Sequence, residues 1–368
     1  MIVVWIGVLL AAVWAAHWGA DRLASPLQKL RRQWGVSEAA GAAFVALATA
    51  SPEIGTNAVS AAQGLSDIGL GNLLGSNIIS VPAIVTVAYL ASQTQEANRN
   101  LQQLNPSETD ESPTNESNTN QFSTGRSGAS EQSNGPRLNA LRSWTGLRLK
   151  PEALTAQAIP YLLVIALAAL LTIPAGWRGL QPIDGWIMLA AYGLYVTQAI
   201  LRNRQSSQAV QWQEGEIWRA ICGVLALAVG AYFVVSATER IVSILGISEI
   251  IGGLFITSTL SIAPEVFATW SVARSGQMTA ATTSVIADNT ATMTLAFFPL
   301  AIAGLPIEDM LLFSVNLAFV AILGAAYAGL IRWGKQESSF ELWEVCLLIA
   351  IYLAYLLVML VWVLDVFS

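Results

Sequence analysis

The chain has 368 residues, of which 54% are hydrophobic and only 11% are charged, and its formal net charge is −6. Soluble domains carry about 25% charged residues, so this composition predicts a membrane protein, and the acidic balance argues against a nucleic-acid partner. With two cysteines and one histidine, His17, the chain lacks the residues for a disulfide framework or a typical zinc site. We expect His17 at the membrane interface, just after the first apolar segment.

Ten apolar segments follow one another along the chain, each close to the roughly 20 residues that a helix needs to cross a bilayer. We therefore predict an all-α integral membrane protein with ten transmembrane helices. The second and seventh segments are long, as expected for tilted or broken helices. The ten segments lie at about 2–20, 36–64, 68–91, 153–173, 184–201, 217–236, 247–273, 279–303, 308–331 and 342–365.

One stretch, residues 92–150, differs from the rest because it is rich in Ser, Asn, Gln, Thr and Glu. Such a composition cannot bury enough apolar surface to fold, so we predict a disordered cytoplasmic insert. Its composition favours a plain linker over a regulatory segment. A second, shorter linker is expected at 203–216.

Positive charge is distributed unevenly between the two sides of the predicted helices. If the N-terminus is outside, all of the 18 Lys and Arg residues except Arg178 and Arg240 fall on the inner side. Cytoplasmic loops carry an excess of such residues. The sequence therefore predicts a multi-pass protein of the plasma (inner) membrane with both termini outside.

An internal repeat organises the chain. Gly35-Val-Ser-Glu38 matches Gly246-Ile-Ser-Glu249, and a Pro-Glu pair ends 18 residues after Gly35 and 19 residues after Gly246. Five helices per half is an odd number, so the second half enters the membrane from the opposite side and the repeats are inverted. We assign helices 1–3 (1–91) and 4–5 (151–202) to the first repeat, and helices 6–10 (217–368) to the second.

The Pro-Glu pairs lie deep inside predicted spans, at Pro52-Glu53 and Pro264-Glu265. Proline removes a backbone donor, so each helix is expected to loosen there. A carboxylate at membrane depth is costly and indicates a functional site. Two such breaks at matching places in two halves predict a transporter's binding site where the halves meet.

A second polar cluster follows each Pro-Glu pair at the same distance. Ser76 lies 23 residues after Glu53, and Asp288 lies 23 residues after Glu265. Three acids thus lie in apolar spans without Lys or Arg nearby, so they must bind a cation or take up protons. Neutral oxygens surround them, and an all-oxygen cage suits Ca²⁺, Na⁺ and, less well, Mg²⁺. The candidate metal ligands are Glu53, Glu265, Asp288, Thr49, Ser261, Ser76, Asn77, Asn289, Ser80 and Thr292, with the carbonyls of Ala48 and Leu260 added where proline frees them.

These motifs resemble those of the sodium/calcium exchanger family of cation/Ca²⁺ antiporters. In the first half they are Ala46-Leu-Ala-Thr-Ala-Ser-Pro-Glu53 and Gly71-Asn-Leu-Leu-Gly-Ser-Asn77, and in the second Ser258-Thr-Leu-Ser-Ile-Ala-Pro-Glu265 and Ala287-Asp-Asn289. The resemblance covers all ten helices and omits the polar insert. It implies that Glu53 and Glu265 share Ca²⁺. It also implies Thr49 and Ser261 as ligands one turn earlier and Ser76 as a flanking ligand.

The sequence departs from the family pattern where sodium ligands are expected. The serine that follows the threonine in the family is here Ala50 or Ile262, and Ser80 and Thr292 stand where Asn or Asp is usual. Asp288, in contrast, adds a carboxylate about one helical turn, or about 5.4 Å, from the usual position. Protons could replace sodium as the counter-ion, because burial favours the uncharged form of a carboxyl group.

We therefore predict a secondary active cation antiporter in which Ca²⁺ efflux is coupled to Na⁺ or H⁺ entry by alternating access. The resemblance implies that helices one and six slide. The expected partners are the lipid bilayer and inorganic cations, with no cofactor and no enzyme activity. The alternatives are an H⁺-coupled antiporter for another cation and a non-transporting cation-binding paralogue. An intramembrane acid protease is disfavoured, because neither a Tyr-Asp nor a Gly-x-Gly-Asp motif occurs.

Overall fold

A computed structural model describes residues 1–34, 46–104, 151–202, 210, 212–274, 278–333 and 340–364. Within these ranges the chain is helical and contains no strand. The elements are α1 (Ile2–Gln33), α3 (Ser51–Gln63), α4 (Ser66–Leu104), α6 (Pro151–Thr172), η1 (Ala175–Trp177), α7 (Pro182–Arg202), α8 (Glu214–Leu245), α9 (Glu249–Ile251), η2 (Gly252–Thr257), α10 (Ser258–Arg274), α11 (Met278–Ala291), η3 (Thr292–Ala296), α12 (Phe297–Ala303), α13 (Met310–Trp333), α14 (Leu342–Val358) and η4 (Met359–Val363). Three of them, η2, η3 and η4, are π-helical turns.

Seven helical stretches in the described ranges are long and apolar enough to cross a membrane. A further apolar helix, Gln157–Thr172, is shorter. The all-helical class predicted from the sequence is thus confirmed, whereas the count of ten spans stays a prediction. The seven candidate spans are Ile2–Leu30, Ser66–Thr94, Gly215–Leu245, Glu249–Arg274, Ser284–Ala303, Met310–Arg332 and Leu342–Val363.

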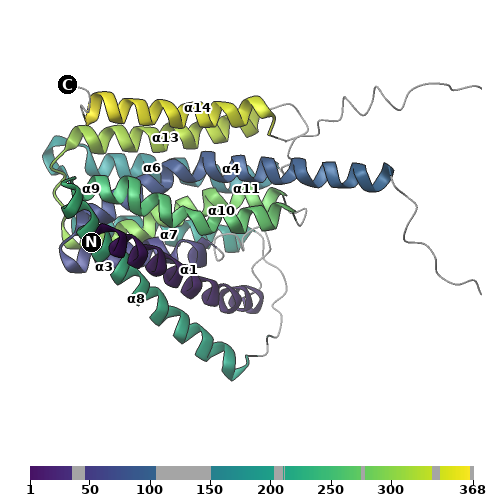
Figure 1. The fold of residues 1–368 in the computed structure, drawn as a ribbon, viewed down its shortest axis with the longest axis horizontal. Helices are drawn as coiled ribbons and strands as arrows, with labels where there is room; N and C mark the ends of the chain where they lie inside the picture. The colour runs from purple at the N-terminus through teal and green to yellow at the C-terminus, as the bar shows by residue number, and fades with distance from the viewer. Residues whose placement is uncertain are drawn as a thin grey trace, which may run out of the picture.

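The helices lie side by side along the long axis of the molecule, with α8 oblique to the others (Figure 1). The chain enters α1 and leaves η4 at the same end of this bundle (Figure 1). Helix α4 is central, because most of the side chains in its apolar window are buried and it contacts α3, α10, α11, α13 and α14. The apolar windows of α1 and α8 are mostly exposed, as expected for helices that face lipid.

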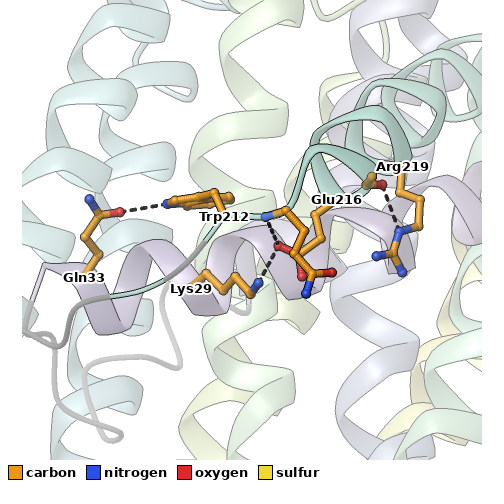
Figure 2. Close-up of polar contacts among 7 residues, drawn as sticks. Lys29, Gln33, Trp212, Glu216 and Arg219 are labelled. Carbon is orange, nitrogen blue, oxygen red and sulfur yellow. Dashed lines mark hydrogen bonds and ion pairs between the residues drawn. The ribbon is translucent and has the colours of Figure 1, made fainter.

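Helices α1 and α8 pack tightly against each other in antiparallel directions. A Cβ atom on Gly19 would lie 2.7 Å from the backbone nitrogen of Leu227, and Gly223 faces Gly19 in turn. Such small residues let two helix backbones approach closely. At the other end of the contact, Lys29 of α1 pairs with Glu216 of α8 (Figure 2).

Helix α4 runs parallel to the segment formed by η2 and α10. Gly71 packs against Ile250 and Leu254, and Gly75 packs against Leu254 and Ser258. A Cβ atom on Gly71 would lie 2.7 Å from the Leu254 nitrogen. Close backbone contact therefore joins the two segments that carry Ser76 and Ser261.

Several predicted boundaries are wrong. Helix α1 continues to Gln33 rather than ending near residue 20, and Pro26 lies inside it. Helix α4 continues to Leu104, into the range assigned to the polar insert, and α8 begins at Glu214, inside the range of the short linker. In each case polar residues extend a helix past its apolar part, which hydropathy alone does not reveal. Residues 105–150, Gly35-Val-Ser-Glu38 and most of the linker at 203–216 lie outside the described residues, so their predictions stay untested.

The two proline breaks differ from each other. In the first half, a helical turn at 46–49 is separated from α3 by Ala50, and Pro52 lies in the first turn of α3, where its missing N–H leaves no hydrogen bond unmade. In the second half, α10 continues across Pro264. The irregular segment precedes it, as the π-helical turn η2. The predicted loosening therefore occurs at Pro52 but is displaced from Pro264.

Candidate functional site

Glu53 carries a buried carboxyl group whose oxygens lack hydrogen-bond partners. It lies in the first turn of α3, where the helix dipole favours an acidic side chain. The residue is 1% exposed, and neither of its carboxyl oxygens has a hydrogen-bond partner. Buried polar atoms nearly always have a partner, so two free oxygens on one carboxyl group need an explanation.

The two other predicted acids lie near Glu53. Asp288 of α11 is buried and accepts a hydrogen bond of 2.6 Å from the Thr49 hydroxyl. Glu265 of α10 is partly exposed. Asp288 acts electrostatically on Glu53, and both of these acids act on Glu265. No Lys or Arg of the described chain is among the charges that act on the three. The structure therefore brings the predicted acids together without a balancing cation from the protein.

The acids do not form a ready-made metal centre by themselves. Among the described residues, no group of three or more His, Cys, Asp or Glu side chains converges closely enough to hold a metal ion. A cation bound here would need neutral oxygens as well, or a small movement of the acids toward it. Ca²⁺ takes six to eight oxygen ligands in irregular geometry, so such a mixed set suits it.

The neutral oxygens predicted as ligands mostly hydrogen-bond within the protein. The Ala48 carbonyl accepts from Ser51 (2.7 Å). Ser76 donates to the Leu73 carbonyl (3.3 Å), and Thr292 donates to the Asp288 carbonyl (3.0 Å). These contacts leave lone pairs on the hydroxyl oxygens, because a donating hydroxyl can still accept. The three hydroxyl groups of Thr49, Ser76 and Thr292 can thus point an oxygen at a cation while they donate elsewhere.

Asn77, Asn289 and Ser80 form a connected network that sequence reasoning did not foresee. The hydroxyl of Tyr161, on α6, donates to Asn77 Oδ1 (3.2 Å) and accepts from Asn289 Nδ2 (3.5 Å). Ser80 donates to Asn289 Oδ1 (3.0 Å). Asn77 Nδ2 donates to the Leu73 carbonyl (2.8 Å). Each amide oxygen therefore already accepts a hydroxyl hydrogen.

A second network links Ser261 to the buried asparagines Asn72 and Asn57, and the role of Asn57 was not predicted from the sequence. The Ser261 hydroxyl lies 3.5 Å from Asn72 Oδ1, and Asn72 Nδ2 lies 3.4 Å from Asn57 Oδ1. Asn57 in turn donates to the Ala296 carbonyl of η3 (3.1 Å). Asn57 follows Glu53 by one helical turn, and this spacing was the signal in the sequence that could have identified it.

The expectation that His17 follows the first helix is wrong, whereas its position relative to the membrane interface stays a prediction. His17 lies inside α1, its Nδ1 is 2.9 Å from the Val13 carbonyl, and its Nε2 is buried near the Ser261 backbone. The first helix extends well beyond residue 20, so His17 is not at its end. The single histidine therefore faces the proline-containing helix α10.

Comparisons with known proteins identify a family and a shared fold. The sequence pattern of the sodium/calcium exchanger protein family matches residues 4–107 and 216–361. A structure of the sodium-calcium exchanger NCX_Mj, soaked with Na⁺ and Sr²⁺, has a TM-score of 0.59 and 18% identity, and covers 97% of this chain and 99% of its own. The H⁺/Ca²⁺ exchanger CAX has a TM-score of 0.61 and 13% identity, and covers 96% of this chain and 79% of its own. At such low identity these structures show a shared fold. Comparison with curated proteins finds no significant match.

Proposed function

The chain belongs to the sodium/calcium exchanger protein family, and from this premise we propose that it is a secondary active antiporter that exports Ca²⁺ in exchange for Na⁺ or H⁺. The observation that carries the proposal is Glu53, whose two buried oxygens lack any hydrogen-bond donor. A buried anion without a partner is strongly unfavourable. A cation shared with Glu265 and Asp288, or a bound proton, supplies the missing partner, and competition between the two couples their transport.

We propose Glu53, Glu265 and Asp288 as the charged ligands of Ca²⁺. Thr49, Ser76, Ser261 and Thr292 would supply neutral oxygens, and the short hydrogen bond between Thr49, in the turn before α3, and Asp288 of α11 supports a common location for ligands from the two halves. Asp288 is only 6% exposed, so we propose that exchange of its bound ion with water involves movement of α11. Binding of the ion is therefore expected to be coupled to helix movement.

Alternating access requires one part of the protein to move against another. We propose that α1 and α8 move together, because they pack closely on each other and most of their apolar surface is not covered by the rest of the protein. The antiparallel course of α1 and α8 also supports the proposed inverted repeats, in which the first helices of the two halves run in opposite directions. Ten spans, with both termini outside the plasma (inner) membrane, complete this proposal.

The residues near the site favour H⁺ over Na⁺ as the counter-ion. Ala50 is buried beside Thr49, and Ile262 is buried beside Ser261, so neither position offers the hydroxyl that a sodium ion would use. A proton needs only the carboxyl groups themselves. The two similar structures described above come from one exchanger of each kind by their printed names, so the fold is compatible with either ion.

A gradient-swap experiment tests the proposed function. The purified full chain is reconstituted in vesicles, and uptake of radioactive Ca²⁺ is compared under an H⁺ gradient, a Na⁺ gradient and no gradient. We expect uptake driven by one of the gradients and lost in Glu53→Gln and Glu265→Gln variants. Absence of gradient-driven uptake by well-folded wild-type protein, or full uptake by both variants, would contradict the proposal. A Ca²⁺-dependent thermal shift without flux would instead indicate a cation-binding protein that does not transport.

A further inference from the structure

Tyr161 occupies a central position beside the candidate site. Its side chain is fully buried at 0% exposure, and its hydroxyl lies between Asn77 of α4 and Asn289 of α11. By the repeat alignment, these two asparagines are equivalent, because each follows the residue that lies 23 positions after a Pro-Glu glutamate. The Tyr161 hydroxyl thus hydrogen-bonds to two asparagines that occupy equivalent positions in the two repeats.

The packing around the ring shows that the fold accommodates a large side chain here. A Cβ atom on Gly324 of α13 would lie 2.9 Å from Cε1 of the Tyr161 ring, which is closer than real Cβ contacts. Gly324 therefore leaves room for the ring. Because the interior is close-packed, the hydroxyl has little freedom to leave the two amides.

Both amide oxygens of the network around Tyr161 accept a hydrogen bond, in contrast to the carboxyl oxygens of Glu53. Tyr161 and Ser80 each donate to one asparagine oxygen, and Asn77 Nδ2 donates to a main-chain carbonyl. A cation that used the amide oxygens in full would have to compete with these hydroxyl donors. The carboxyl oxygens of Glu53 face no such competition.

We propose that Tyr161 is a positioning residue that determines cation selectivity: it holds the Asn77 and Asn289 amides together and, by donating to the Asn77 oxygen, weakens that oxygen as a ligand for a second, monovalent cation beside the carboxylates. This inference rests on the proposed function. A divalent ion needs the charge of the acids and is little affected by the weakening of a neutral oxygen. A sodium ion at a flanking position depends on such neutral oxygens, because no further carboxylate remains for it.

Removal of the hydroxyl in Tyr161→Phe frees the oxygen of Asn77 and loosens Asn289. We expect Na⁺ on the Ca²⁺ side to inhibit Ca²⁺ uptake at a concentration about tenfold lower than in wild type, the change that corresponds to one hydrogen bond of ordinary strength. The Ca²⁺ KM without Na⁺ should change much less. A purely structural role would instead lower the thermal midpoint and the amount of active protein and leave the Na⁺ sensitivity unchanged.

Tyr355→Phe is the matched control. Tyr355 is also buried, at 2% exposure, and its hydroxyl also donates to an asparagine oxygen, that of Asn316 (2.8 Å). This pair lies on α13 and α14, and its other hydrogen bonds go to the Leu312 carbonyl and the sulfur of Met359. The control therefore loses the same type of bond at the same burial and has no link to the carboxylates.

The experiment measures Ca²⁺ uptake by the reconstituted full chain over a series of Na⁺ concentrations, together with thermal midpoints in detergent. Gly324→Ala serves as a second test variant, because it displaces the Tyr161 ring without removing its hydroxyl, and it should raise Na⁺ sensitivity too. Equal Na⁺ sensitivity in Tyr161→Phe, Gly324→Ala and Tyr355→Phe would overturn this inference alone. Absence of any uptake that depends on Glu53 in wild-type protein would overturn the proposed function, and this inference with it.

Discussion

Two buried polar clusters of this bundle differ in whether their hydrogen bonds are complete. Between α13 and α14, Asn316 donates to the Leu312 carbonyl (2.7 Å) and accepts from the Tyr355 hydroxyl (2.8 Å). In α3, both oxygens of Glu53 lack a donor, although the residue is just as deeply buried. An unmade hydrogen bond costs about 1–3 kcal/mol. In the proposed function, the α13–α14 cluster serves folding, whereas the site near α3 gives up stability to keep the Glu53 oxygens available for a cation.

The largest expected effect comes from replacement of the Glu53 carboxyl group, whose oxygens lack a hydrogen-bond donor. In Glu53→Gln we expect Ca²⁺ affinity to fall by at least about a hundredfold, or ~3 kcal/mol, because a deeply buried opposite charge is lost. Stability without Ca²⁺ should not fall, since a neutral amide is easier to bury than a carboxylate. Calorimetric titration of Ca²⁺ and thermal unfolding in detergent measure the two quantities. A variant that loses stability and keeps Ca²⁺ affinity would mean that Glu53 is structural.

The second prediction concerns the acid in the second half. Asp288→Ser should weaken Ca²⁺ binding by about tenfold or more, and addition of Thr292→Asp should restore part of it. Thr292 is the first residue of η3, four residues after Asp288; it is buried, and its hydroxyl donates to the Asp288 carbonyl (3.0 Å). A carboxylate there would lie on the same helix face. The Ca²⁺ KM for uptake is measured for the single and double variants. If the double variant has the same KM as Asp288→Ser, residues 288 and 292 do not share a face toward the ion.

In the cluster of Asn316 and Tyr355 between α13 and α14, we expect a substitution to lower stability and to leave Ca²⁺ transport nearly unchanged. Asn316→Ala should destabilise the protein by about 1–3 kcal/mol, because the Tyr355 hydroxyl loses its partner inside the bundle. The Ca²⁺ KM should stay within about twofold of wild type, since distant sites act nearly independently. Thermal unfolding and uptake kinetics on the same preparation test this. A large change in KM with little loss of stability would remove the distinction between the two clusters.

The smallest effect is expected for a charged pair outside both clusters. Lys29 and Glu216 are partly exposed and join α1 to α8, and Trp212 lies over the Lys29 amine and donates to Gln33 (3.3 Å; Figure 2). Exposed ion pairs contribute little, and salt screens them. Lys29→Gln should lower the thermal midpoint slightly at low salt and not at high salt. The double variant with Glu216→Gln should show no further loss, and a salt-independent loss would point to packing instead.

Features that depend on hydropathy and on short motifs could be predicted from the sequence. Hydropathy located the seven apolar spans of the described residues, and the paired Pro-Glu breaks predicted that the acids of the two halves would lie near one another. These predictions succeed because burial of a carboxylate in an apolar span is visible in the sequence itself. The family was also identified from the motifs, and the family match over residues 4–107 and 216–361 confirms it.

Features that depend on packing between distant segments were missed. Tyr161 stands in an apolar run, and nothing nearby in the sequence indicates that its hydroxyl would meet amides from α4 and α11. Asn77, Asn289 and Ser80 were interpreted as cation ligands, but they hydrogen-bond to each other or to Tyr161. The choice between a hydrogen bond and an ion ligand is made by the geometry between helices, which one sequence does not contain.

The central claim is that Glu53, Glu265 and Asp288 share one cation within the membrane. The most direct measurement is a crystal structure of the full chain grown with Ca²⁺, in which anomalous scattering locates the ion. We predict a peak with Glu53 and Glu265 oxygens at roughly 2.3–2.6 Å, the usual Ca²⁺–oxygen distance, and no peak in crystals of Glu53→Gln. A fully occupied ion elsewhere, with the Glu53 carboxyl group still without a partner, would contradict the account.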